Sequence, residues 1–244
     1  MSGQAGLVSA QAAPVRLALI HALAHSVAPI NEALAAAWPQ ALRMNLLDDS
    51  LSTDLARSAG LDATMTQRFI TLADYAVGTG AHAILYTCSA FGPCIEAVAR
   101  RHPQLPVLKP NEAMIDDALT LLGRVRGGRI GLLASFGPTL ASMPAEFPSG
   151  TPLATALAEG ALAALDAGDS ATHDALCAEA AAQLALQGCT LIVLVQFSLA
   201  RAAATVQART GLPVLTTVDS AVRRLRQRLS LGSPGCPGTG QAER

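Results

Sequence analysis

The sequence predicts an α/β fold made of two similar halves, each built around a parallel sheet. Short apolar runs alternate along the chain with amphipathic segments of about 10–15 residues, which is typical of β-α-β units. The pattern of the first half starts again near residue 129, so the halves can be laid over one another. Hydrophobic residues make up 51% of the 244 residues, which is enough to bury a core in each half.

In the first half, apolar runs predict the strands and the segments between them predict helices. The helix after the first strand ends at Pro39, because proline cannot continue it. Asp62 is a suitable N-cap for a helix whose apolar residues recur at helical spacing up to Gly78, and Asn111 is expected to cap the last helix. The expected strands are residues 15–20, 42–47, 82–87 and 106–108, and the expected helices are 26–38, 62–78, 93–101 and 111–122.

The second half repeats this order. Segments that begin at Ala83 and Leu191 both read as a strand, a polar turn, a helix, a Leu-Pro-Val strand and another helix. Residues 155–167 contain a passage from strand to helix whose boundary the pattern does not fix. The other expected strands are 129–134, 191–195 and 214–215, and the helices are 170–187, 199–210 and 219–229. The expected domains are residues 15–111 and 112–216, with a helix at 217–230 that can pack on the first half and flexible tails at 1–14 and 231–244.

The composition argues against several classes of partner. The net charge is −1 and only one of the 17 basic residues is Lys, so there is no basic patch for nucleic acid or an acidic membrane. No apolar run reaches the roughly 18 residues that span a bilayer, and the N-terminus lacks the features of a signal peptide. The five cysteines are irregularly spaced and form no zinc motif. We therefore expect a cytoplasmic protein without a metal, a nucleic-acid partner or a membrane partner.

The repeat predicts that two polar turns meet in a cleft between the halves. Ligands bind at the carboxyl ends of parallel strands, and these ends carry Cys88 in one half and Gln196 and Ser198 in the other. Cys88 precedes a helix that starts near Pro93, and a helix N-terminus lowers a thiol pKa and attracts carboxylates. A thiol there could move a proton at carbon or act as a nucleophile. The alternative is a buried cysteine with a packing role.

These segments resemble the Asp/Glu racemase superfamily, which includes aspartate, glutamate and hydantoin racemases, maleate isomerase and arylmalonate decarboxylase. The resemblance covers residues 15–229 and rests on the half-repeat and on the segments ILYTCSAFGP, GRIGLLASFGPTL and LLDDSL. It implies two Rossmann-like domains related by a pseudo-twofold axis, with cofactor-independent chemistry at Cys88 in the cleft between them. It also implies a small carboxylate substrate and a homo-oligomer, in the form of a dimer.

The sequence departs from that superfamily in two places. The racemases use one cysteine from each half, on opposite sides of the substrate carbon, and the repeat places Gln196 at the second position. Neither Gln196 nor Ser198 titrates near neutral pH, so both could stabilise an enolate by hydrogen bonds but not act as unaided bases. A role in capping the next helix is the alternative. The other departure is a Pro-rich segment after Thr139, where a long helix is usual.

Hydroxyl and imidazole side chains complete the predicted site. Thr87 and Ser89 flank Cys88, where they could bind a carboxylate or the thiolate, or simply shape the turn. The resemblance implies that further turns hold substrate carboxylates, and the candidates there are His21, Ser26, Ser135 and Thr139, with Asp49 near the cleft in an orienting or capping role. His21 or His25 could assist Cys88, because both titrate near neutral pH. Phe91, Phe136 and Phe197 adjoin these turns.

Four functions follow from these residues. The first is an isomerase or racemase that acts on a small carboxylate or amino-acid-like substrate through Cys88 as a single acid, base or nucleophile. The second is a decarboxylase, for which one thiol suffices because an enediolate needs only one proton. The third is a carboxylate-binding protein without catalysis. The fourth is a redox sensor that uses Cys88 and Cys94.

Overall fold

The computed structural model describes residues 14–231, which form two four-stranded sheets in which every pairing is parallel. The sheet orders are β2-β1-β3-β4 and β6-β5-β7-β8, so the second sheet repeats the first. These sheets confirm the predicted α/β fold. The flexible tails predicted at 1–14 and 231–244 lie almost entirely outside the described residues.

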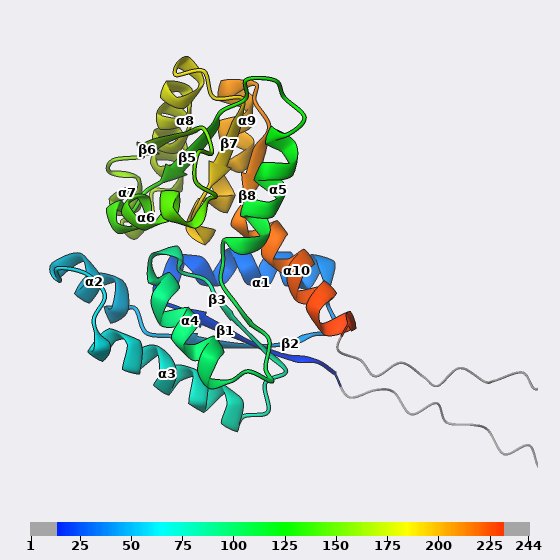
Figure 1. The fold of residues 1–244 in the computed structure, drawn as a ribbon. Coiled ribbons are helices and arrows are strands. Elements are labelled where there is room, and N and C mark those ends of the chain that lie inside the picture. Colours follow the sequence, from blue (N-terminus) through cyan, green and yellow to red (C-terminus); the bar gives the residue numbers. More distant parts are fainter. Residues whose placement is uncertain (1–13, 232–244) are drawn as a thin grey trace, which may run out of the picture.

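The first sheet occupies the lower part of Figure 1. Its unit contains, in chain order, β1 (Arg16–His21), α1 (Val27–Ala37), β2 (Leu42–Leu47), α2 (Ser50–Arg57), α3 (Ala63–Gly78), β3 (Ala83–Tyr86), α4 (Gly92–Arg101) and β4 (Val107–Leu108). Two short 3-10 helices, η1 (Ala24–Ser26) and η2 (Ser89–Phe91), precede α1 and α4. As predicted, Asp62 caps α3, because its carboxylate accepts a hydrogen bond from the Met65 amide.

The second sheet lies above the first in Figure 1. The rest of the chain contains α5 (Glu112–Leu122), β5 (Ile130–Ala134), α6 (Gly137–Ser142), η3 (Met143–Glu146), β6 (Leu153–Leu157), α7 (Ala161–Asp166), α8 (Ser170–Leu186), β7 (Leu191–Leu194), η4 (Phe197–Ala202), α9 (Ala203–Thr210), β8 (Val214–Thr216) and α10 (Thr217–Leu231). The strand-to-helix passage that the pattern left open divides into β6 and α7.

Alternating strand residues build a core on each face of each sheet. In β1, Leu17 and Leu19 face α1 and α10, whereas Ala18 and Ile20 face α2, α3 and α4. This alternation is the period-2 pattern of a strand that is buried on both sides. In β5 of the second sheet, Leu132 faces α5, whereas the next residue, Leu133, faces α8 and α9. Each unit is therefore a three-layer sandwich of helices, sheet and helices.

Two helices pack on the unit that follows or precedes them in the chain. α5 comes directly after β4, yet Met114, Ile115 and Ala118 belong to the core of the second sheet. α10 follows β8, yet Val222 and Leu225 belong to the core of the first sheet. The two helices are joined by ion pairs between α5 carboxylates and α10 arginines. Figure 1 shows α5 and α10 side by side at the junction of the two units, which this exchange ties together.

The structure differs from the expected elements mainly in short segments. Helix α2 was not expected, although Leu51 and Leu55 are buried at helical spacing. Asn111 stands at the N-cap position of α5, but its Oδ1 accepts no capping bond, and its Nδ2 donates to Met143 Sδ. No helix of residues 14–231 is both long enough and apolar enough to cross a membrane.

Candidate active site

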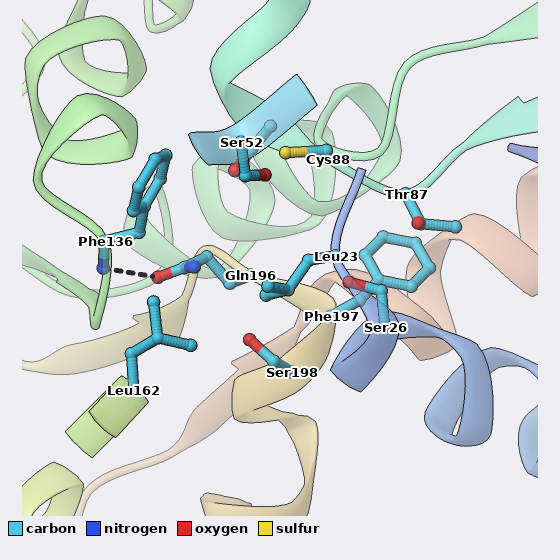
Figure 2. A pocket seen from close by; sticks show the side chains of 11 residues that line it. Leu23, Ser26, Ser52, Thr87, Cys88, Phe136, Leu162, Gln196, Phe197 and Ser198 are labelled. Carbon is cyan, nitrogen blue, oxygen red and sulfur yellow. Dashed lines mark hydrogen bonds between the residues drawn. The ribbon is translucent and has the colours of Figure 1, made fainter. Parts of the chain in front are cut away.

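A small pocket lies between the two units, where the turns after β3 and β7 meet. Figure 2 shows that its side chains come from both units and point toward a common space. The lining residues are Leu23, Ser26, Ser52, Thr87, Cys88, Ser89, Phe136, Leu162, Gln196, Phe197 and Ser198. The space open to the centre of a water-sized sphere is about 20 Å³, which is little more than one water molecule occupies. This conformation is therefore closed.

Cys88 ends the extended segment after β3 and precedes η2 and α4. Its side chain is partly exposed to the pocket, and its thiol is free. Desolvation raises the pKa of the thiol to about 11, while the Ala90 amide and the Ser52 hydroxyl lower that pKa by less. The expectation that the helix N-terminus lowers this pKa is therefore wrong, because desolvation outweighs the nearby amide. At neutral pH the group is a thiol.

Ser52 on α2 is one of the two groups that lower the pKa of the Cys88 thiol. Figure 2 shows its side chain beside Cys88. The Ser52 hydroxyl donates a hydrogen bond to the carbonyl oxygen of Ala22 at 2.7 Å, which holds the side chain in this position. Sequence reasoning missed Ser52 because it did not predict α2.

Gln196 follows β7 and has one fixed orientation. Its Oε1 accepts hydrogen bonds from the backbone amides of Ser135 at 2.6 Å and of Phe136 at 3.2 Å. Two donors fix Oε1 on this side, so the Nε2 amino group points the other way, toward the pocket (Figure 2). Gln196 makes no side-chain capping bond to η4. The amide is therefore arranged to donate hydrogen bonds to a ligand.

Hydroxyl groups supply further polar atoms. Ser198 is 1% exposed, lines the pocket, and its Oγ has no hydrogen-bond partner within the described residues. A buried polar atom without a partner is uncommon and is satisfied when a ligand or water binds. Ser89 Oγ lies 3.3 Å from Thr139 Oγ1, which links the first unit to α6. Ser26 lines the pocket and makes no capping bond to α1.

Thr87 connects the pocket to buried His21. His21 Nδ1 lies 2.8 Å from Thr87 Oγ1, and His21 Nε2 lies 3.0 Å from Asn45 Oδ1. His21 itself is fully buried and does not line the pocket. Burial lowers the pKa of His21, and the hydrogen bond to Asn45 opposes this only in part. His21 is therefore neutral at pH 7 and reaches the pocket only through Thr87.

Several predicted residues lie outside the inner pocket. Ser135 takes part through its backbone amide, and Thr139 does not line the pocket but contacts Ser89, which does. Asp49 and His25 line an outer groove of about 730 Å³ next to the pocket. Phe91 is buried in the core against Phe69, with ring centroids 4.8 Å apart. The other two phenylalanines, Phe136 and Phe197, do line the pocket as their position in the sequence suggested.

The outer groove shares four residues with the pocket, and these separate the two spaces. They are Leu23, Ser52, Phe136 and Leu162, from both units. At the rim, His25 Nε2 lies 2.8 Å from Asp166 Oδ1 and thus bridges the units. A molecule larger than water must displace these side chains, or part the units, to reach Cys88.

The chemistry of the pocket is limited by its side chains. Cys88 is the one cysteine and the one titratable side chain among the residues that line it. Residues 14–231 contain no cluster of His, Cys, Asp and Glu side chains that could hold a metal. Cys94 is buried, its Sγ lies 3.5 Å from Thr66 Oγ1, and its thiol is free. The pocket can thus offer one protic sulfur, an amide donor and hydroxyl groups to a ligand.

Comparisons with known proteins give similar folds. A glutamate racemase isoform from Bacillus anthracis is 11% identical, with a TM-score of 0.72 over 91% of this chain and 84% of that chain. Allantoin racemase from Klebsiella pneumoniae is 18% identical, with a TM-score of 0.63 over 89% of each chain. Arylmalonate decarboxylase is 20% identical, with a TM-score of 0.59 over 91% of this chain and 96% of the other. All three share the two-sheet architecture.

Sequence comparison is more specific. No curated protein matches the chain at a significant level. The family model for Asp/Glu/hydantoin racemases matches residues 22–225, which include the second sheet, strands β2, β3 and β4 of the first sheet and the whole inner pocket. The chain therefore belongs to the Asp/Glu/hydantoin racemase family.

Proposed function

We propose that this protein is a cofactor-independent lyase in which the Cys88 thiol delivers one proton to a carbanion beside a carboxylate. Decarboxylation of a small substituted malonate is the reaction that this site supports best. The observation that carries the proposal is that Cys88 is the one titratable side chain among the residues that line the pocket. Desolvation supports it, because it raises the pKa of the thiol to about 11 and so favours the protonated form.

The reaction needs only what the pocket contains. The bond between the central carbon and one carboxylate breaks, CO2 leaves, and the electron pair remains as an enediolate on the other carboxylate. The Gln196 amino group is oriented to donate a hydrogen bond to the developing negative charge, as an oxyanion hole does. The S–H proton of Cys88 then moves to carbon, and water returns a proton to the thiolate.

A racemase with two bases requires more than these residues supply. It must hold one thiolate and one thiol on opposite sides of a carbon, and the position opposite Cys88 holds Gln196. An amide cannot take up a proton at neutral pH. In addition, a thiol pKa of about 11 leaves roughly one thiolate in 10⁴ molecules at pH 7. Single protonation therefore agrees with the site better than exchange between two faces.

A racemase or isomerase is the second candidate, because the matching family model describes racemases. In that case a bound substrate would have to lower the pKa of Cys88, and a hydroxyl group or water would act on the other face. This second candidate predicts different products, because a racemase or isomerase interconverts isomers without releasing CO2.

The two candidates are separated by a substrate panel. The purified protein is incubated with 2-substituted malonates and with L-aspartate, L-glutamate and allantoin, and CO2 release and optical rotation are followed. The proposal predicts CO2 release from a malonate, and loss of that activity in Cys88→Ala. Cys94→Ala is the matched control, since Cys94 is a thiol of the same unit outside the pocket. Full activity in Cys88→Ala would contradict any role for this sulfur.

A further inference from the structure

A chain of hydrogen bonds runs from Thr87 through His21 and Asn45 to Asn31. The donor and acceptor of each bond can be assigned by starting from Asn31. Asn31 Nδ2 lies 2.8 Å from the carbonyl oxygen of Val27, which can only accept. This contact identifies the nitrogen of the Asn31 amide. The same Nδ2 lies 2.8 Å from an atom of Asn45, so that atom must accept and is Oδ1.

The Asn45 oxygen in turn determines which nitrogen of His21 carries the proton. Asn45 Oδ1 is 3.0 Å from His21 Nε2, and two acceptors cannot share a hydrogen bond, so Nε2 carries the ring proton. His21 is neutral because burial lowers its pKa, so Nδ1 has a lone pair and no proton. His21 Nδ1 therefore accepts, and the hydroxyl of Thr87, 2.8 Å away, donates its proton to it.

The competing acceptor for that proton is weak. The carbonyl oxygen of Ile20 is 3.5 Å from Thr87 Oγ1, at the limit of a hydrogen bond, and it already accepts from the Thr87 backbone amide at 3.0 Å. The proton of Thr87 is thus committed to His21. Thr87 lines the pocket, and in Figure 2 its oxygen lies on the pocket side of the side chain. What it offers the pocket is a lone pair.

We infer that Thr87 is a specificity-determining hydrogen-bond acceptor, held so by His21, Asn45 and Asn31, and that the substrate presents an N–H or O–H donor to it. This rests on the proposed function and narrows it, because the donor lies beside the carbon that Cys88 protonates. The substrate class is a malonate with a hydroxyl, amino or amide substituent. A carboxylate at Thr87 is disfavoured, since two acceptors would face each other.

Thr87 and Gln196 therefore have complementary roles in the pocket. Gln196 donates and Thr87 accepts, and they come from opposite units. The carboxylates of the substrate belong on the Gln196 side, and the substituent with its donor belongs on the Thr87 side. His21 and Asn45 are positioning residues, because they act on the ligand only through Thr87.

The direction of the hydrogen bonds from Thr87 through His21 to Asn45 is tested without any ligand, by ¹⁵N NMR of the His21 ring in the intact protein at pH 7. We expect a protonated Nε2 and an unprotonated Nδ1. In Asn45→Leu, which removes the acceptor for Nε2–H, we expect a mixture of tautomers. A wild-type spectrum with the proton on Nδ1 would overturn the inference, because Thr87 would then be free to donate to the pocket.

The consequence for binding is tested by calorimetry with hydroxymalonate and methylmalonate, whose substituents are similar in size. Wild type and Thr87→Ser should prefer hydroxymalonate, and Thr87→Val should reduce that preference about tenfold, the value of one neutral hydrogen bond. No preference in wild type, an unchanged preference in Thr87→Val, or no binding of either anion would contradict the inference. Neither the NMR nor the calorimetric measurement requires turnover. Their results therefore test the role of Thr87 even if the protein does not decarboxylate malonates.

Discussion

At the scale of single residues, the site depends on how each polar atom is already engaged. Gln196 could in principle accept or donate, but two backbone amides occupy its oxygen and leave the amino group for a ligand. Cys88 could be an acid or a base, and desolvation favours its protonated form, as the proposed acid role requires. Sequence reasoning named both residues as site candidates, and the structure places both in the lining of the inner pocket. It could not assign their roles. The amides that orient Gln196 lie about 60 residues away in the sequence, and Ser52, which acts on Cys88, lies in a helix that was not predicted.

The protonation state of Cys88 gives the first prediction. Far below a pKa of about 11, the thiolate fraction rises tenfold with each pH unit. Alkylation of Cys88 by iodoacetamide should therefore be slow at pH 7 and rise about tenfold per unit up to pH 10, as followed by mass spectrometry. An alkylation rate that levels off below pH 9 would show a thiolate and contradict the acid role. Cys88→Ala gives the background from the other cysteines.

The orientation of Gln196 gives the second prediction. Replacing Gln196 by Leu removes the amino group that is directed at the pocket and leaves the amides of Ser135 and Phe136 without their acceptor. Loss of one such donor lowers kcat by about 10²–10³ in other enzymes, and we expect a decrease of this order here. Turnover of the best malonate measures it. A kcat within threefold of wild type would show that Gln196 does not contact the reacting group.

At the scale of elements, the site is assembled from turns that follow parallel strands. The apolar runs predicted these strands well, because a strand buried on both faces leaves a continuous apolar signal. Helix α2 was missed because it has only eight residues and its outer face is polar, yet it brings Ser52 to the thiol. Asn45 was missed because its role depends on the alignment of β1 with β2, which sequence periodicity does not show.

The short helix η3 gives the third prediction. Glu146 is partly buried next to the start of α4, and desolvation raises its pKa although Lys109 opposes this. A raised native pKa means that the ionised carboxylate weakens the fold above this pKa, and that this effect disappears as the pH falls through it. Glu146→Gln should therefore unfold at higher urea concentration than wild type at pH 7, and at a similar concentration near pH 4.

The control for this measurement is Glu179→Gln, because Glu179 is exposed and its pair with Arg209 lies on the surface. Such pairs contribute little to stability, so this variant should match wild type at both pH values. If Glu146→Gln were less stable than wild type at pH 7, the carboxylate would be a net stabilising group, through Lys109, and the sign of the effect would be wrong.

At the scale of the whole molecule, a substrate can reach Cys88 only if the two units part or if the side chains between the inner pocket and the outer groove move aside. The inner pocket holds little more than one water molecule, and the His25–Asp166 contact bridges the units at its entrance. A partly exposed pair of this kind contributes at most about 1 kcal/mol, so either His25→Gln or Asp166→Asn should change KM less than about fivefold. The double variant should be no worse than the worse single variant. Additive effects would show that these residues act separately.

Much of this architecture could be predicted because the chain repeats itself. The superposition of the segments at Ala83 and Leu191 predicted that Cys88 and Gln196 occupy equivalent turns, and the structure brings both into one pocket. The closure of that pocket could not be predicted. It depends on Phe136, Leu23 and Leu162, which meet only when the two units are placed face to face.

The central claim is that one sulfur delivers one proton to one face of a carbanion. It is tested most directly by running the reaction on a 2-substituted malonate in D2O and analysing the product by NMR and chiral chromatography. The account predicts one deuterium at the central carbon in a single configuration, and no product from Cys88→Ala. Deuterium in both configurations, or unchanged product formation in Cys88→Ala, would contradict it.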